Sequence, residues 1–429
     1  MQTVAFYTLG CKVNQYDSQA MLEEFQKAGY QAVAFEEKAD VYVINTCTVT
    51  GVGDKKSLQT LRRAQRQNPN AEVVLAGCLA QRMGEELLDT GARLILGTQN
   101  RAQVVCLLEE AVRLNRQTVA VDSLSSRPYE PLSVTAQEGH TRAVLKIQEG
   151  CSRRCTYCII PSVRGPIRSR PLADIRREAQ RLSGAGFLEL VLTGIHLASY
   201  GRDFQDGTAL LDAVRAVAEV PGVARIRLGS LEPTIVTGGF AEDLRALPKV
   251  CPQFHLSLQS GSDSVLRRMA RSYTAAQYES AVGRLKEAFP DVSITTDVLT
   301  GFPGETQEEH LETLATCRRI GFSRMHVFPY SQRAGTPAAA MPGQLSKAVK
   351  EQRARELIAL GEGLAQNYRQ SLLGSVQQVL LEDALPDGRM KGYTPQYVQV
   401  AVMGGSPGAL LNVRLTGLEE EGMCGVSAE

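Results

Sequence analysis

The sequence has almost no net charge and no secretory leader. Its 47 Lys and Arg residues are offset by 46 Asp and Glu residues, which leaves a formal charge of +1. The bulk charge therefore indicates neither a polyanionic nor a polycationic partner, and any basic surface must be local. The first residues, MQTVAFYTLGCKVNQ, contain no basic stretch followed by an apolar stretch and a cleavage site. We therefore expect the chain to remain in the cytosol.

Long apolar runs, internal repeats and low-complexity tracts are also lacking. Residues 392–413 carry no charge, but Pro395, Pro407 and several glycines interrupt them, so no membrane-spanning helix is predicted. Hydrophobic residues make up 43% and charged residues 22% of the chain, which excludes extensive disorder. At ~150 residues per domain, the 429 residues predict two to four domains with at least one large core.

The sequence contains ten cysteines, a number that needs an explanation in a cytosolic chain. The cytosol is reducing and the chain is long enough to fold without covalent cross-links, so a disulfide framework is not expected. Metal or redox chemistry is the better first hypothesis.

The N-terminal region, residues 1–122, alternates short apolar runs with amphipathic stretches. This alternation is typical of βα units around a parallel sheet. Three of the predicted strands end beside a cysteine, namely Cys11, Cys47 and Cys78. Functional residues of an open parallel sheet gather beyond the carboxyl ends of its strands, so these three thiols can meet in space. Three small buried cysteines without a function are the alternative interpretation.

The rest of the chain predicts a linker and two further domains. Residues 123–140 are polar and are expected to link the domains. Residues 141–370 contain six further apolar runs separated by helical stretches, which predict a curved parallel sheet or partial barrel closed by a long helix at about 346–373. Residues 371–429 resemble a small β-barrel in their short strands and their Gly and Pro content.

The strongest local motif is EGCSRRCTYCIIP, which places Cys151, Cys155 and Cys158 in a CxxxCxxC loop after a predicted strand. Closely spaced thiolates are the usual ligands of iron–sulfur clusters. Three ligands for four irons leave one iron open to a substrate's amino and carboxylate groups. A zinc knot or three unrelated thiols is the alternative, but zinc normally requires a fourth ligand and no partner pair follows.

These motifs carry a resemblance to a known family. The CxxxCxxC loop resembles the radical S-adenosylmethionine (SAM) superfamily, and TLGCKVNQYDS, NTCTVT and AGCLAQ resemble its methylthiotransferase branch. The resemblance implies an α/β fold in three parts: an N-terminal parallel-sheet domain of Rossmann or flavodoxin-like type, a central radical SAM partial (β/α)6 barrel, and a small C-terminal β-barrel of TRAM type. It covers nearly the whole chain in the domain order of the family.

The resemblance also implies cofactors and an activity. Cys151, Cys155 and Cys158 would hold the 4Fe-4S cluster that cleaves SAM, and Cys11, Cys47 and Cys78 would hold an auxiliary 4Fe-4S cluster. The CKVN, NTCTVT, LTGIHLASYG and RLGSLEP segments resemble the subtype that attaches a methylthio group to C2 of N6-threonylcarbamoyladenosine at position 37 of tRNA. The same chemistry on isopentenyladenosine in tRNA or on a ribosomal-protein aspartate is the alternative. A non-catalytic iron–sulfur or RNA-binding protein would not cleave SAM.

Further motifs at predicted strand ends are candidates for binding SAM. They are Thr193, Gly194, Ser230, Glu232, Gln259 and Ser260. The LTGIH segment departs from the Gly-Gly-Glu form of the superfamily, so a backbone contact is expected there. Turn and helix-cap chemistry would favour the same Ser and Gly residues. His196 is a weaker candidate at the same edge.

Basic residues near both cysteine trios favour an RNA partner, which the resemblance implies is the anticodon stem-loop of tRNA. Residues 151–181 contain eight arginines and two acidic residues; the arginines are Arg153, Arg154, Arg164, Arg168, Arg170, Arg176, Arg177 and Arg181. A helix face with Lys55, Lys56, Arg62, Arg63 and Arg66 adds to this charge. A solvated helix face is the alternative for each. An external electron donor and a sulfur donor are also implied.

The C-terminal domain offers less to RNA. From residue 371 onward it contains three basic and seven acidic residues, so phosphate binding is doubtful there. Stacking of bases on Tyr393 or Tyr397 is the remaining way for this domain to contact RNA.

Overall fold

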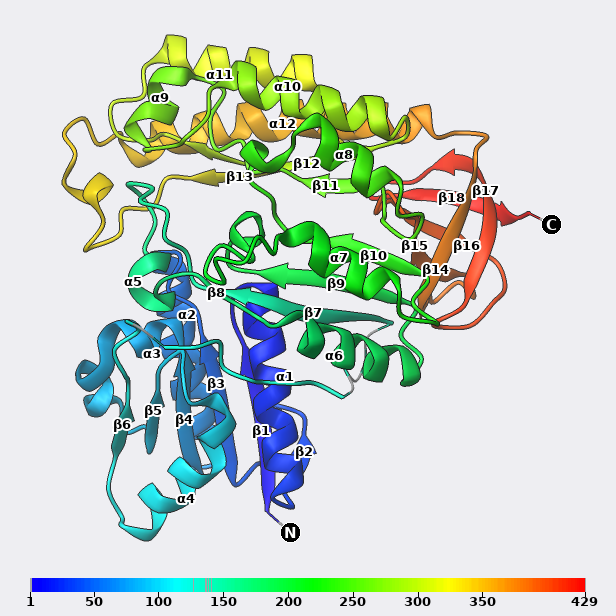
Figure 1. Ribbon diagram of the computed structural model, residues 1–429. Helices are drawn as coiled ribbons and strands as arrows, with labels where there is room; N and C mark the ends of the chain where they lie inside the picture. The colour runs from blue at the N-terminus through cyan, green and yellow to red at the C-terminus, as the bar shows by residue number, and fades with distance from the viewer. Residues whose placement is uncertain (1, 126, 136, 138, 140, 429) are drawn as a thin grey trace.

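The computed structural model describes residues 2–428 except 126, 136, 138 and 140. Its N-terminal part is a six-stranded parallel sheet in the order β2-β1-β3-β4-β5-β6 (Figure 1). The strands are β1 (Thr3–Thr8), β2 (Gln31–Val33), β3 (Val41–Thr46), β4 (Glu72–Gly77), β5 (Leu94–Leu96) and β6 (Thr118–Ala120). The helices are α1 (Lys12–Lys27), α2 (Gly51–Gln67), α3 (Cys78–Met83), η1 (Gly84–Thr90), η2 (Arg101–Gln103) and α4 (Val104–Arg113).

Both faces of this sheet are covered, which explains its continuous apolar strands. Along β3, Val41 and Val43 face one core with α1 and α4, whereas Tyr42 and Ile44 face a second core with α2 and η1. Strands buried on both faces lose the alternation of polar and apolar residues. All six strands end at the same edge, where the loops after β1, β3 and β4 carry the three cysteines.

The central part is a partial barrel of two parallel sheets joined edge to edge. One sheet has the order β10-β9-β7-β8, with the short β8 antiparallel to β7, and the other has the order β11-β12-β13. Parallel bridges Ile226↔Val250 and Leu231↔Leu256 join the two sheets. The strands are β7 (Arg142–Glu149), β8 (Arg168–Ser169), β9 (Glu189–Gly194), β10 (Arg225–Leu228), β11 (Gln253–His255), β12 (Ser293–Thr300) and β13 (Arg324–Pro329).

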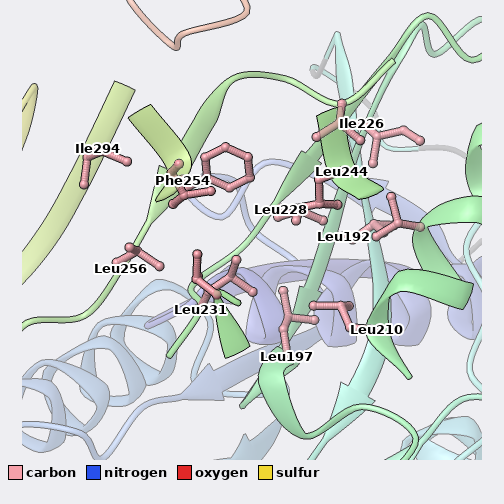
Figure 2. Packing of buried hydrophobic residues seen from close by; sticks show 14 of the residues in the cluster. Leu192, Leu197, Leu210, Ile226, Leu228, Leu231, Leu244, Phe254, Leu256 and Ile294 are labelled. Atoms are coloured by element: carbon pink, nitrogen blue, oxygen red, sulfur yellow. The ribbon is translucent and has the colours of Figure 1, made fainter. Parts of the chain in front are cut away.

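Most helices of the central part cover the outer face of the partial barrel, whereas α5 (Ile160–Arg164) packs against α3 of the N-terminal part. The other helices are α6 (Leu172–Gly184), η3 (Leu197–Ser199), α7 (Leu210–Ala218), η4 (Pro233–Ile235), α8 (Gly238–Arg245), α9 (Asp263–Arg268), α10 (Ala275–Ala288), α11 (Gln307–Ile320), η5 (Pro337–Ala340) and α12 (Lys347–Ser371). Figure 2 shows the large core between them and the strands, where side chains such as Leu192, Ile226 and Phe254 are fully buried.

The inner face of the barrel is polar instead. Lys146, Gln148, Glu189, Arg227 and Gln253 are all buried there. Helix α1 of the N-terminal part lies against β7 and β9 (Figure 1). The two parts therefore share a polar interface, whose charges must be paired because water is excluded.

The C-terminal part is a closed barrel in the order β14-β15-β16-β18-β17 (Figure 1). Its strands are β14 (Val376–Ala384), β15 (Met390–Tyr393), β16 (Gln399–Val402), β17 (Leu410–Leu418) and β18 (Met423–Ser427). Arg142 on β7 pairs with Glu382 at 2.6 Å, and Arg227 on β10 donates to the carbonyl of Pro395 at 2.9 Å. The barrel is thus fixed against the amino ends of the central strands.

The fold expected from the sequence is confirmed in its class and in its six central parallel strands. In the C-terminal part, the apolar runs at 375–384, 393–402 and 411–418 predict three strands, which are β14, β16 and β17. The strands β15 and β18, and the short β2 and β6, were not expected. The boundaries at 122, 140 and 370 stay predictions; residues 126, 136, 138 and 140 of the expected linker lie outside the described residues. Across the residues that are described, no helix has the length and apolarity needed to cross a membrane.

Truncating a side chain in the central core should destabilise the protein strongly. Leu192 is fully buried on β9. Leu192→Ala is expected to lower the free energy of unfolding by about 2–5 kcal/mol in urea titrations, because it leaves a cavity. The control is Leu311→Ala, whose side chain is 52% exposed and which should cost less than about 0.5 kcal/mol. Equal effects of the two substitutions would contradict this core.

Candidate active site

The CxxxCxxC loop follows β7 and is anchored at both of its ends. Gly150 has φ +74°, and a Cβ there would lie 1.8 Å from the carbonyl oxygen of Pro166, so only glycine fits. The amide of Cys151 donates to the carbonyl of Gly165 at 2.9 Å. Thr156 donates from its amide to Met269 at 3.1 Å and from its hydroxyl to Arg268 at 2.8 Å. The loop is therefore held in place by segments that come later in the chain, and Arg268 lies 112 residues after Thr156.

The three thiols of this loop favour binding of a cation. Cys151 is buried, and Cys155 and Cys158 are half-buried. Burial raises the pKa of Cys158 to about 12, and the charges of Cys155 and Cys151 add to the shift. Burial also raises the pKa of Cys151, so the thiols of Cys151 and Cys158 would bear protons at neutral pH until a positively charged group bound beside them. Three neighbouring thiols that favour a bound cationic group are suitable ligands for an iron–sulfur cluster.

Arg271 is a neighbour of this loop that sequence reasoning missed. It follows α9 and donates from Nη1 to the Sγ of Cys155 at 3.3 Å. Its Nε donates to the hydroxyl of Tyr273 at 3.0 Å, and its guanidinium lies 4.8 Å from the centre of that ring. No local sequence signal marks Arg271, because only the barrel brings it back to a loop 116 residues earlier.

Glu232 is the predicted SAM-binding residue that the structure brings closest to this loop. Its buried carboxylate pairs with Arg153 of the loop, with Arg271 at 3.6 Å and with His196 at 3.4 Å. Burial raises the pKa of Glu232, but the hydrogen bond from His196 and the charges of Arg271 and Arg153 outweigh it and hold the pKa at about 2. The carboxylate is therefore ionised at neutral pH.

The other predicted SAM-binding residues do not share one environment: they lie at a strand end, at an exposed position and in a turn. Thr193 and Gly194 end β9 beside Gln148, which accepts from the amide of His196 at 2.7 Å. Ser230 is exposed. Gln259 has a φ of +67°, a strained conformation at a turn. The hydroxyl of Ser260 is buried and lies 3.2 Å from that of Thr313 on α11, so it takes part in turn packing.

The second trio lies at the ends of adjacent parallel strands. Thr8 of β1 is in register with Asn45 of β3, and Thr46 of β3 with Gly77 of β4, which places Cys11, Cys47 and Cys78 at one edge. Cys11 is exposed, Cys47 is half-buried and Cys78 is buried. Burial raises the pKa of Cys78 to about 11, against the lowering effect of a nearby arginine.

Two residues that flank Cys11, after strand β1, shape this second site. Gly10 has φ +98°, and a Cβ there would lie 2.9 Å from the Sγ of Cys47. Asn14 donates from Nδ2 to the carbonyls of Leu9 at 2.7 Å and Thr46 at 3.0 Å. Asn14, the last residue of CKVN, therefore ties the loops that carry Cys11 and Cys47 to each other.

The ligand role of the six cysteines stays a prediction. Within the part of the chain that the structure describes, no group of three His, Cys, Asp or Glu side chains is arranged to hold a single metal ion. In a 4Fe-4S cluster each cysteine binds a different iron, so its ligands stand further apart than those of one ion. Cys106, Cys251, Cys317 and Cys424, which the sequence analysis did not use, have no disulfide partner.

The arginine-rich segment is not the RNA surface that its composition predicts. Arg164, Arg168 and Arg170 are buried, and Arg153 pairs with Glu232. Arg176 and Arg177 are exposed but pair with Glu219 and Asp174, respectively. Most of this charge compensates carboxylates inside the protein or on its own helix. Arg154 remains exposed beside a hollow of about 590 Å³ that Cys151 and Ser152 also line.

The tyrosines of the C-terminal barrel are not free to stack on bases. The rings of Tyr393 and Tyr397 stack on each other, with centroids 4.8 Å apart. Arg142 covers both rings at 4.9 and 4.8 Å, and Arg227 lies 4.6 Å from the ring of Tyr397. These faces are thus used to dock the barrel, which corrects the base-stacking hypothesis.

Comparisons with known proteins agree with this geometry. Residues 3–97 match the family described as "Uncharacterized protein family UPF0004", and residues 145–317 match the radical SAM superfamily. The chain is also similar in fold to the radical SAM methyltransferase TsrM of Kitasatospora setae, with a TM-score of 0.59 at 16% identity over 79% of this chain and 74% of that one. The fold and the cysteine loop define a radical SAM enzyme.

Curated relatives narrow the family. The threonylcarbamoyladenosine tRNA methylthiotransferase MtaB of Bacillus subtilis is 43% identical over 94% of this chain and 91% of its own length. MtaB of Thermotoga maritima is 35% identical over 100% and 98%, respectively. The tRNA-2-methylthio-N(6)-dimethylallyladenosine synthase of Acidothermus cellulolyticus is 35% identical over 97% and 86%. The chain belongs to the radical SAM methylthiotransferase family.

Removing the carboxylate of Glu232 should destabilise this site in a pH-dependent way. Glu232→Gln is expected to lower the free energy of unfolding by about 1–3 kcal/mol at pH 7, because Arg153 and Arg271 lose a buried anionic partner. The folded-state pKa of about 2 lies below the unfolded value of 4.5, so this contribution is present above pH 4.5 and is lost as the pH falls toward 2.

Urea titrations of the metal-free protein at several pH values measure this effect. The difference in the free energy of unfolding between the wild type and Glu232→Gln should become smaller below pH 4.5. The exposed Glu242→Gln on α8 serves as the control and should change little at any pH. A difference that stays constant down to pH 3 would argue against an ionised, paired Glu232.

Proposed function

We propose that this enzyme attaches a methylthio group to C2 of N6-threonylcarbamoyladenosine at position 37 of tRNA, with two 4Fe-4S clusters and SAM. The observation that supports this most is the meeting of the two cysteine trios across one interface. Helix α5, which follows the CxxxCxxC loop directly, packs against α3, which begins with Cys78. Ile159 and Val163 share a buried apolar cluster with Cys78.

The chemistry of the target atom requires a radical. Carbon 2 of adenine has no acidic proton and no leaving group, so acid–base or nucleophilic catalysis cannot readily activate it. When bound, one cluster would supply the electron that cleaves SAM to methionine and a 5′-deoxyadenosyl radical, and the other the sulfur that a second SAM methylates. The C2 hydrogen atom would pass to this radical and give 5′-deoxyadenosine. The carbon–sulfur bond would form as the methylthio sulfur separates from the auxiliary cluster, which would take up the one electron released.

The residues of the chain orient these groups and exclude water. Cys151, Cys155 and Cys158 would hold the SAM-cleaving cluster, and Cys11, Cys47 and Cys78 the auxiliary cluster. Arg271 and Glu232 form a buried ion pair beside Cys155, where the charged amino and carboxylate groups of SAM would have matching partners. Cys78 and Cys151 are buried, whereas Cys11 is exposed, so an extruded base would approach from the side of Cys11.

The exposed face of α2 is the best surface for the phosphates of tRNA. Helix α2 begins four residues after Cys47, and its basic side chains point to solvent. These side chains are Lys55, Lys56, Arg62, Arg63 and Arg66. Exposed Val49 and Val52 lie between them and the cysteine, where apolar contact with an unstacked base is favourable. We place the tRNA anticodon stem-loop on this surface.

The assignment of threonylcarbamoyladenosine as the substrate is based on the names of the relatives. The Bacillus subtilis enzyme, at 43% identity, is named for threonylcarbamoyladenosine, whereas the relatives named for dimethylallyladenosine are 34–36% identical. We place the present enzyme in the cytosol, where its tRNA substrate lies. External donors would supply the electron and the sulfur.

Mass spectrometry of nucleosides tests this function. The reconstituted protein is incubated anaerobically with SAM, sulfide, a reductant, and tRNAs carrying either the threonylcarbamoyl or the isopentenyl modification. A methylthio gain on threonylcarbamoyladenosine alone is expected. A gain on the isopentenyl nucleoside would overturn the substrate assignment but retain the chemistry, and no gain on either tRNA would favour a protein substrate.

Two cysteine variants separate the roles of the two trios. Cys155→Ala is expected to abolish formation of 5′-deoxyadenosine, because it removes a ligand of the SAM-cleaving cluster. Cys47→Ala should still cleave some SAM but yield no methylthio product. Both products are measured in the same reaction, and Cys106→Ala, an exposed cysteine of α4, is the control expected to behave as wild type. Methylthio product from Cys47→Ala would refute the auxiliary site.

A further inference from the structure

Arg164 belongs to the radical SAM loop by its backbone and to the other cysteine trio by its side chain. It is the last residue of α5, six residues after Cys158. The next residue, Gly165, accepts from the amide of Cys151 at 2.9 Å, which fixes the position of this backbone. From there the guanidinium reaches into the N-terminal part and is fully buried.

The side chain of Arg164 has a partner on each of its three nitrogens. Nε donates to the Sγ of Cys78 at 3.2 Å. Nη1 donates to Asp17 at 3.0 Å and to Glu149 at 3.1 Å, and Nη2 donates to Oδ1 of Asn14. The planar fork is thus held in one orientation by three residues, and that orientation aims an N–H at the sulfur of Cys78.

The charges around Arg164 leave one positive charge without a carboxylate. Among the residues that the structure describes, the network of buried ions contains four cations and three carboxylates; they are Arg101, Lys146, Arg164 and Arg168, and Asp17, Glu130 and Glu149. An unmatched charge in a dry interface is costly. The network therefore presents this excess positive charge to the Sγ of Cys78, to which Arg164 donates.

We propose that Arg164 is a positioning residue that fixes Cys78 against the radical SAM loop and makes the auxiliary cluster easier to reduce. This inference rests on the auxiliary cluster of the proposed function. Hydrogen bonds and positive charge at a ligating sulfur stabilise the reduced, more negative state of a cluster. Losing them makes the reduction potential more negative.

A purely structural role is the alternative, and Arg101 allows the two roles to be separated. Arg101 is buried in the same network and pairs with Asp17, Glu130 and Glu149, but the structure gives it no contact with a cysteine. Arg101→Gln therefore damages the same interface without removing the N–H···S bond. Arg164→Lys keeps the charge but replaces the fork with a single ammonium group.

The experiment is a redox titration followed by EPR. All variants carry Cys151→Ala, Cys155→Ala and Cys158→Ala, so that only the auxiliary cluster is observed. Arg164→Gln should shift the midpoint potential to more negative values, and both Arg164→Lys and Arg101→Gln should shift it less. Equal shifts in Arg164→Gln and Arg101→Gln, or no shift in Arg164→Gln, would overturn the proposal.

A measurement without an Arg164 substitution covers the case in which these variants fail to fold. The triple-alanine chain is produced with arginine labelled with ¹⁵N at Nε. Pulsed EPR of its reduced cluster should detect a ¹⁵N coupling that is absent when lysine is labelled instead. A cluster without this coupling would overturn the role of Arg164 alone, whereas a triple-alanine chain that binds no iron would overturn the auxiliary site of the proposed function as well.

Discussion

A buried network of charges between the N-terminal sheet and the radical SAM barrel holds the two cysteine sites together. Asp17 on α1 meets Lys146 of β7 at 2.7 Å and Arg164 of α5 at 3.0 Å, and Glu149 at the end of β7 meets the same two cations. Each ion costs several kcal/mol to remove from water, and only complete pairing offsets that cost. The two parts can therefore associate in few arrangements, and the arrangement seen here brings Cys78 to the radical SAM loop.

This constraint suits the chemistry of the family. A radical that is formed at one site and a sulfur that is held at another must reach the same carbon atom, so their separation has to be fixed before the substrate binds. Each trio has an arginine that donates to one of its sulfurs, Arg271 to Cys155 and Arg164 to Cys78. The interface itself is buried and polar, while the exposed edge near Cys11 and the basic face of α2 are where we propose that the RNA binds.

The sequence predicts the parts of the site that local patterns determine. Cys11, Cys47 and Cys78 could be grouped because their strands are apolar, regularly spaced and parallel, and parallel strands end at one edge. The fold class followed from the same periodicity. Glu232 was a candidate because it follows a strand, although its ion partners were not foreseen.

The sequence does not predict the parts of the site that depend on which distant segments of the chain pack against each other. A count of arginines cannot tell whether they face RNA or a carboxylate brought from elsewhere in the chain, so Arg164 and Arg170 were misread as phosphate contacts. Tyr393 and Tyr397 are covered by Arg142 and were misread for the same reason. Arg271 has no motif around it. In each case the deciding partner is distant in sequence.

EPR of the protein with both proposed clusters reduced can show whether the two cysteine trios hold clusters that face each other across this interface. The reference is the sum of two spectra, one from a chain with alanine at positions 151, 155 and 158, the other from a chain with alanine at 11, 47 and 78. We expect a spectrum that is broadened relative to this sum by magnetic coupling between the two clusters. A spectrum equal to the sum would contradict it.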